Sequence, residues 1–142
     1  MVPPIPFTKL YLLLLVALLC QLIVSHAQVL TGFTLIKPPN TSLGPVPSTI
    51  NLADVGTSLN IKAETTPGAN IAKVVFWFDG SPVSTEIVEP YALGRNKKNT
   101  YFSFPRLSNI GTHTVVAKAY NSNRKLIEEK SVTFTVDRKS VV

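Results

Sequence analysis

The chain has 142 residues, 45% of them hydrophobic and 15% charged, which excludes an intrinsically disordered chain and suits one packed domain. The formal net charge is +6. Removing Lys9, which lies in the apolar N-terminal segment, leaves 13 Lys and Arg against 8 Asp and Glu, or +5. This charge favours contact with acidic surfaces such as anionic polysaccharide or lipid. Scattered charges that keep the protein soluble are the simpler explanation.

The N-terminal segment has the three parts of a secretory signal peptide. Lys9 ends a short n-region, residues 10–19 are an unbroken apolar run, and Ser25-His26-Ala27 offers small residues at −3 and −1 of a cleavage site. We therefore expect a signal-peptide helix over 1–27 and cleavage before Gln28. The mature protein would be secreted or displayed at the cell surface, and it would meet the membrane only transiently, through this segment.

Two other readings of the segment remain open. An uncleaved signal anchor is disfavoured because the apolar run is shorter than the roughly 20 residues of a full span. A lipoprotein is disfavoured because Leu19 precedes Cys20, where a small residue is normally needed. Cys20 is the only cysteine, so the mature domain would have neither a disulfide nor a cysteine-based site. Export also makes nucleic acid a poor candidate partner.

The rest of the chain is predicted to be all-β. Short apolar–polar alternations separated by turn residues predict seven or eight strands, with no helical period; the expected strands are 29–37, 57–64, 72–78, 81–88, 101–104, 112–120 and 126–136. Gly44-Pro45-Val46-Pro47 should prevent regular pairing and mark an edge crossing between sheets. Asp79-Gly80 predicts a tight hairpin turn. We expect one antiparallel β-sandwich over 28–138 and a short polar tail over 139–142.

The period of two assigns side chains to the faces of each strand. In 57–64, Leu59, Ile61 and Ala63 should face the core, and Ser58, Asn60 and Lys62 the solvent. In 72–78 the core positions are Val74, Phe76 and Phe78. If 112–120 is the neighbouring strand, the outer positions of both strands form an exposed apolar patch rimmed by Lys118, made of Val75, Trp77, Val116, Lys118 and Tyr120.

This patch is the strongest candidate interaction face. Exposed apolar patches mark binding surfaces, and Trp and Tyr are typical anchors. Flat aromatic rings also stack on sugars. The alternative is that the chain's own loop over 95–101 covers Trp77.

One stretch carries a family resemblance. Leu107-Ser108-Asn109-Ile110-Gly111-Thr112-His113-Thr114-Val115 resembles the corner before strand F of immunoglobulin-like domains, with Asn109, Gly111 and His113 at the characteristic offsets. With the ordered segments 32–36, 59–63, 74–80, 89–93 and 132–136, the chain resembles a bacterial-type immunoglobulin-like module of exported and cell-surface proteins. The resemblance implies an immunoglobulin-like sandwich, with His113 in place of the tyrosine that closes the corner. It also implies a spacer or binding scaffold.

Catalytic and metal-binding residues are sparse. The single histidine of the mature chain, His113, is assigned to the corner, and the adjacent Glu128 and Glu129 point to opposite faces of one strand. Glu86 and Glu89 flank the end of a strand, and surface carboxylates explain them equally well. No spacing fits a calcium loop. We therefore expect no enzyme, no cofactor and no metal.

Two surface features complete the set of candidate sites. Arg95, Lys97 and Lys98 form a local basic loop that would suit an acidic glycan or partner, although a solvated loop is the simpler interpretation. Asn40-Thr41-Ser42 is an N-glycosylation sequon, so a glycoprotein is expected if the source is eukaryotic.

The leading hypothesis is a secreted, non-enzymatic structural or interaction module of the extracellular matrix, wall or cell surface. It would present a sheet face or an unpaired edge strand to a protein partner or to another copy of itself. The alternative is a stand-alone carbohydrate-binding module that holds polysaccharide on Trp77 and Tyr120.

Overall fold

The structure is a computed structural model that describes residues 3–4, 6, 8–9, 11–12 and 27–140. Most of the expected signal peptide and the end of the polar tail lie outside the described residues. No helix within the described ranges is long and apolar enough to cross a membrane.

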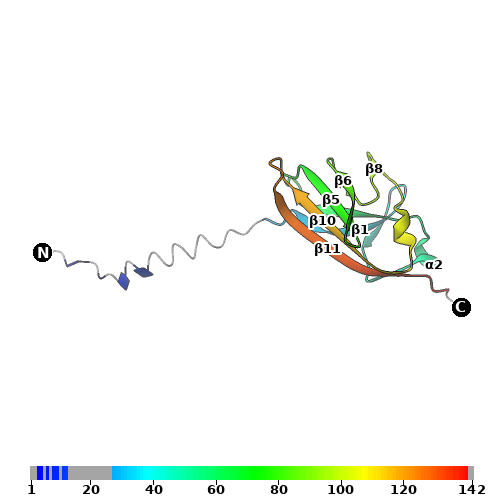
Figure 1. Ribbon diagram of the computed structural model, residues 1–142, viewed down its shortest axis with the longest axis horizontal. Helices are drawn as coiled ribbons and strands as arrows, with labels where there is room; N and C mark the ends of the chain where they lie inside the picture. Colours follow the sequence, from blue (N-terminus) through cyan, green and yellow to red (C-terminus); the bar gives the residue numbers. More distant parts are fainter. Residues whose placement is uncertain (1–2, 5, 7, 10, 13–26, 141–142) are drawn as a thin grey trace.

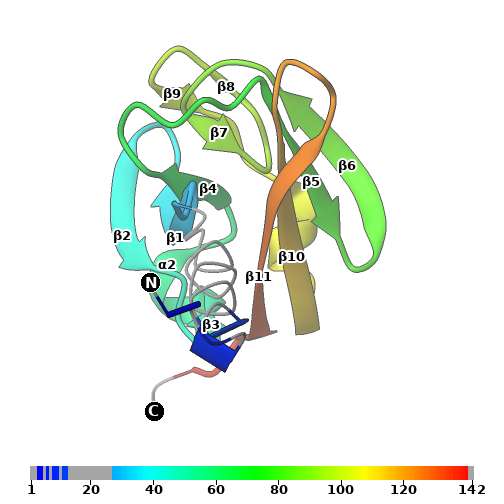
Figure 2. The same ribbon diagram turned by 90° about the vertical axis from the view of Figure 1, so that its left-hand side faces the viewer.

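Two β-sheets pack face to face, as Figures 1 and 2 show. The four-stranded sheet has the order β2-β1-β4-β7, with β2 Thr41–Pro45, β1 Leu30–Lys37, β4 Asn60–Thr65 and β7 Tyr91–Ala92. The five-stranded sheet has the order β3-β11-β10-β5-β6, with β3 Thr49–Asn51, β11 Leu126–Asp137, β10 Gly111–Tyr120, β5 Lys73–Phe78 and β6 Ser81–Glu86. A small hairpin of β8 Asn96–Lys97 and β9 Thr100–Tyr101, a short helix α2 Leu52–Val55 and a 3₁₀ turn over Pro105–Ser108 complete the described elements.

The strand order is that of an immunoglobulin-like sandwich. Strands β1, β4 and β7 take the places of A, B and E in one sheet, and β5, β10 and β11 those of C, F and G in the other. The chain crosses from the four-stranded to the five-stranded sheet between β2 and β3, and β3 pairs parallel to β11, with Thr49 opposite Thr135. The predicted fold class is therefore confirmed.

The core follows the predicted alternation. Val74, Phe76 and Phe78 of β5 are fully buried, and their partners in β10, which are Ala119, Ala117 and Val115 in that order, are fully buried as well. Burial of such side chains contributes about 1.5–3 kcal/mol each. At the end of β5, Asp79 and Gly80 have φ of 49° and 83°, the two positive values that a type I′ hairpin turn requires.

The Pro-rich stretch differs from expectation. Residues 41–45 form β2, which pairs with β1 through an irregular register up to Pro45. A proline is tolerated there because β2 is an edge strand and its outer side needs no N–H. Because β1 is paired with β2 on one side and β4 on the other, the first strand is not an unpaired edge strand that could be presented to a partner. The crossing to the second sheet follows at β3, as predicted.

Asn60 is another departure. The alternation places it on the solvent side of β4, yet its exposed fraction is 0%. The segment after β7 folds over it, and β8 and β9 form an ordered hairpin where the sequence predicts an open basic loop.

Candidate interaction surfaces

His113 closes the corner before β10, where the resemblance places it. Its Nε2 lies 2.8 Å from the backbone oxygen of Asn109, and its Nδ1 lies 2.7 Å from Oδ2 of Asp79. The ring is buried and stacks on Phe78 with centroids 5.0 Å apart. The corner is thus tied to the β5–β6 turn by a side chain that the sequence analysis did not assign, Asp79.

Electrostatics reinforce this connection. Burial alone would raise the pKa of Asp79, but hydrogen bonds from His113 and from the Thr114 backbone N–H lower it below its ordinary value. The ionised carboxylate therefore holds both groups. We assign His113 and Asp79 a structural role because both ring nitrogens of the histidine are engaged.

The structure brings together the five residues of the predicted face. In the pairing of β5 with β10, Trp77 lies opposite Val116, and Val75 lies opposite Lys118, while Tyr120 is one pair further along. All five side chains are half-buried and lie on the outer side of the five-stranded sheet.

The patch is not the exposed apolar surface that the sequence suggests. The Nζ of Lys118 lies 4.3 Å from the centroid of the Trp77 ring, and that of Lys73 lies 5.0 Å from the centroid of Tyr120. Lys118 therefore covers the indole instead of rimming the patch, an arrangement stabilised by cation–π attraction of about 0.5–1 kcal/mol. The indole Nε1 is buried without a hydrogen-bond partner among the described residues.

The loop over 95–101 packs elsewhere. Its backbone is bonded to the other sheet, through Tyr101 N to Pro39 O at 2.7 Å and through the Asn60 amide to Arg95 O at 3.1 Å. Arg95, Lys97 and Lys98 are exposed on this hairpin. The cover over Trp77 is consequently a lysine side chain and not this loop.

One end of the five-stranded sheet carries a mostly apolar row, of which the sequence analysis identified only Tyr120. Leu126 of β11 pairs with Tyr120 of β10, and Tyr120 pairs in turn with Lys73 of β5. Ile87 directly follows Glu86, the last residue of β6, which pairs with Val74. Leu126 is 42% exposed and Ile87 is 71% exposed. We call Leu126, Tyr120, Lys73 and Ile87 the Tyr120 row. Ile87 lies beyond the end of β6, where strand periodicity gives no prediction.

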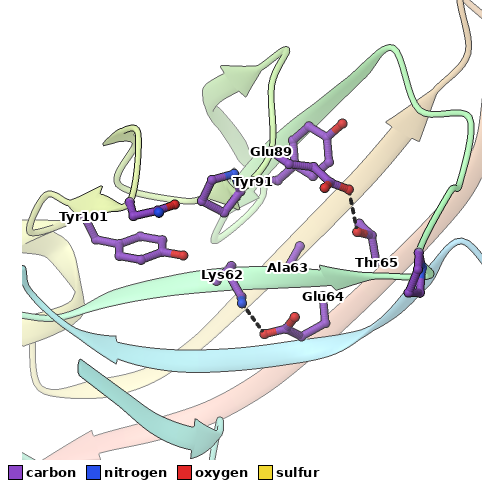
Figure 3. A pocket seen from close by; sticks show the side chains of 10 residues that line it. Lys62, Ala63, Glu64, Thr65, Glu89, Tyr91 and Tyr101 are labelled. Carbon is purple, nitrogen blue, oxygen red and sulfur yellow. Dashed lines mark hydrogen bonds and ion pairs between the residues drawn. The ribbon is translucent and has the colours of Figure 1, made fainter. Parts of the chain in front are cut away.

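A groove of about 540 Å³ opens on the other sheet, and the sequence analysis missed it as well. Figure 3 shows Lys62 and Glu64 of β4 along its floor, Tyr101 at one end and Glu89 towards the other. The full lining is Lys62, Ala63, Glu64, Thr65, Pro67, Glu89, Pro90, Tyr91, Asn99 and Tyr101. The groove exists because β7 pairs only with Lys62 and Ala63, leaving the end of β4 without a neighbour on that side.

Polar contacts fix the floor of the groove. Lys62 Nζ lies 2.8 Å from Glu64 Oε1, and Thr34 donates its hydroxyl to the same oxygen at 2.7 Å. Thr65 donates to Glu89 Oε1 at 2.9 Å. Burial raises the pKa of the Tyr101 hydroxyl; the charge of Lys62 lowers this pKa and that of Glu64 raises it. The hydroxyl therefore stays protonated at neutral pH.

The remaining candidates are placed as follows. Asn40 is exposed in the turn between β1 and β2. Glu128 accepts hydrogen bonds from the backbone N–H groups of Val29 and Leu30, across the two sheets. Within the described ranges, no three His, Cys, Asp or Glu side chains lie together in a way that would hold a metal ion.

Comparison with protein-family models and with curated proteins finds no match to this sequence. Among solved structures, the fold is similar to one described as "Structures of Clostridium thermocellum CbhA fibronectin(III)-like modules". The two chains are 22% identical with a TM-score of 0.47, and the alignment covers 67% of this chain and 94% of that chain.

Proposed function

We propose that this chain is a secreted, non-enzymatic interaction module that binds an extracellular protein partner with the outer face of its five-stranded sheet. The observation that supports this most directly is the Tyr120 row, because Leu126 is an exposed apolar side chain next to Tyr120 and Ile87 is another beyond Lys73. Trp77 and Lys118 continue the same face. Tyr and Trp are typical anchors of protein interfaces, and exposed apolar side chains beside Tyr120 are typical of such surfaces. The signal-peptide pattern of residues 1–27 supports export.

The charge of the face favours an acidic partner over a second copy of the chain. Lys73 and Lys118 both lie on it, each with its ammonium over an aromatic ring. Glu129, which is exposed and lies opposite Lys118, offsets only one of these two charges. Two copies meeting through this face would bring four lysines and two glutamates together, and this excess of like charge is unfavourable at an interface. A partner with acidic and apolar side chains would instead pair with both lysines.

Carbohydrate binding on Trp77 and Tyr120 is less well supported by this geometry. A sugar ring stacks on an open aromatic face, and here a lysine ammonium lies over each ring. Displacing it would forfeit the cation–π attraction that holds it there.

The test uses the chain from Gln28 onward, since the buried core residues that the structure describes lie between Leu30 and Val136. The immobilised protein captures partners from the extracellular fraction of its source, and the captured protein is then purified and its affinity measured. A variant with Ile87→Asp and Leu126→Asp should lose binding. Ile110→Asp is the matched control, because Ile110 is 63% exposed and precedes β10 at the opposite end of that strand.

Binding should also weaken as salt is raised, because Lys73 and Lys118 attract the partner. Equal affinity of the double variant and the control would contradict the proposal. So would light scattering that shows a dimer dissociated by the double variant, since this would assign the face to self-association.

A further inference from the structure

The groove on the four-stranded sheet is a preorganised site. Its overhanging wall, the β8–β9 hairpin, is held by the buried amide of Asn60, which donates to Phe102 O at 2.7 Å and to Arg95 O at 3.1 Å and accepts from Gly94 N at 2.7 Å. Tyr101 N is bonded in addition to Pro39 O. The backbone that carries Tyr101 is thus held in place before any ligand arrives, which lowers the entropic cost of binding.

The groove offers acceptors that the protein does not use. Glu64 and Glu89 each engage Oε1, and within the described part of the chain no hydrogen bond reaches the Oε2 of either. An ionised carboxylate accepts up to about four hydrogen bonds. The Asn99 amide and the Tyr101 hydroxyl lie along the same lining and add donors. Figure 3 shows the Tyr101 hydroxyl pointing into the groove.

From this combination we infer that the groove binds a neutral saccharide, with one sugar ring against Tyr101 and its hydroxyls donating to Glu64 and Glu89. A pyranose presents C–H groups on its faces and hydroxyls at its rim, so it matches an aromatic wall beside free carboxylate oxygens. The volume of about 540 Å³ lies within the range of small-molecule sites. This site is on the sheet opposite the proposed protein-binding face, so the two proposals stand or fall separately.

The charges of the lining exclude an acidic sugar. Lys62 is already paired with Glu64, and Glu89 then leaves the lining with a net negative charge. An anionic saccharide would face two carboxylates at close range, and like charges that approach without water between them repel strongly. The exposed Lys97 and Lys98 belong to the same hairpin but are not part of the lining.

The test is an NMR titration of the isotopically labelled protein, from Gln28 onward, with cellohexaose, mannohexaose, chitohexaose and a heparin-derived hexasaccharide. At about 10 mM, enough to saturate a site with a Kd near 1 mM, a neutral saccharide should shift the backbone amides of residues 62–65 and 99–101. Glu89→Gln and Tyr101→Ala should each weaken binding about tenfold, through loss of a charge-assisted hydrogen bond and of the aromatic wall.

Tyr120→Ala is the matched control, since it removes a half-buried tyrosine from the opposite sheet and should leave binding unchanged. Glu89→Gln is nearly isosteric, so it keeps the test informative if Tyr101→Ala disturbs the hairpin. The inference is overturned if no neutral saccharide shifts these amides, if the shifts centre on Trp77, or if the heparin fragment binds more tightly than the neutral probes.

Discussion

Replacing His113 with phenylalanine tests the corner most directly. Phenylalanine keeps an aromatic ring against Phe78 but removes both hydrogen bonds of the imidazole. The bond to Asn109 O is partly buried, and its loss should cost about 1 kcal/mol. The bond to Asp79 is charge-assisted, but that side chain is 35% exposed, so solvent reduces its contribution to about 1 kcal/mol as well.

The expected loss in the free energy of unfolding is therefore about 2 kcal/mol, or a Tm lower by roughly 10 °C for a domain of this size. Urea unfolding at neutral pH, followed by the fluorescence of Trp77, measures it. A double-mutant cycle with Asp79→Ala isolates the pair, and we expect a coupling energy of about 1 kcal/mol. A His113→Phe variant within about 0.5 kcal/mol of the parent, or strict additivity in the cycle, would refute the assigned role.

Three further predictions concern stability. Because the pKa of Asp79 is lowered in the folded state, its contribution to the free energy of unfolding is complete above the ordinary value of 3.8 and disappears as the pH falls through the lower folded value. In Asp79→Asn the urea midpoint should therefore fall less steeply at acid pH than in the parent. The same acid dependence in both proteins would contradict this. Asn60→Ala should cost about 3 kcal/mol and expose the Gly94 amide to hydrogen exchange, and retained protection would show that the hairpin is held by other contacts. Glu128→Ala should cost about 1–2 kcal/mol and accelerate exchange of the Leu30 amide, whereas Glu129→Ala, at an exposed neighbour, should do neither.

The sandwich itself was predictable because its strands obey short-range rules. The alternation in Val74 to Phe78 places every second side chain in the core, and a tight turn at Asp79-Gly80 needs only two residues with positive φ. The corner at His113 was predictable from the resemblance of residues 107–115 to the corner of immunoglobulin-like domains, and its hydrogen bond spans only four residues. Local patterns therefore sufficed wherever the stabilising contact is local.

The surfaces were less predictable because they depend on contacts between distant segments. Asn60 reads as a solvent-facing residue until a segment 34 to 42 positions later folds over it. The position of Lys118 over Trp77 depends on side-chain conformation, which alternation does not specify. The groove depends on the short length of β7, and no pattern in Tyr91–Ala92 indicates where pairing stops.

The placement of the first and last strands has a mechanical consequence. In Figure 1 the chain enters the sandwich at one end, beside the start of β1, and leaves at the other, beyond the end of β11. Tension between these points would pull β1 and β11 along their own axes, so the hydrogen bonds to β4, β10 and β3 would be sheared together instead of peeled one at a time. Forced unfolding is governed by the rate of such a step. Under such tension the hydrogen bonds from Val29 and Leu30 to Glu128 would join the first strand to the last and add to this resistance.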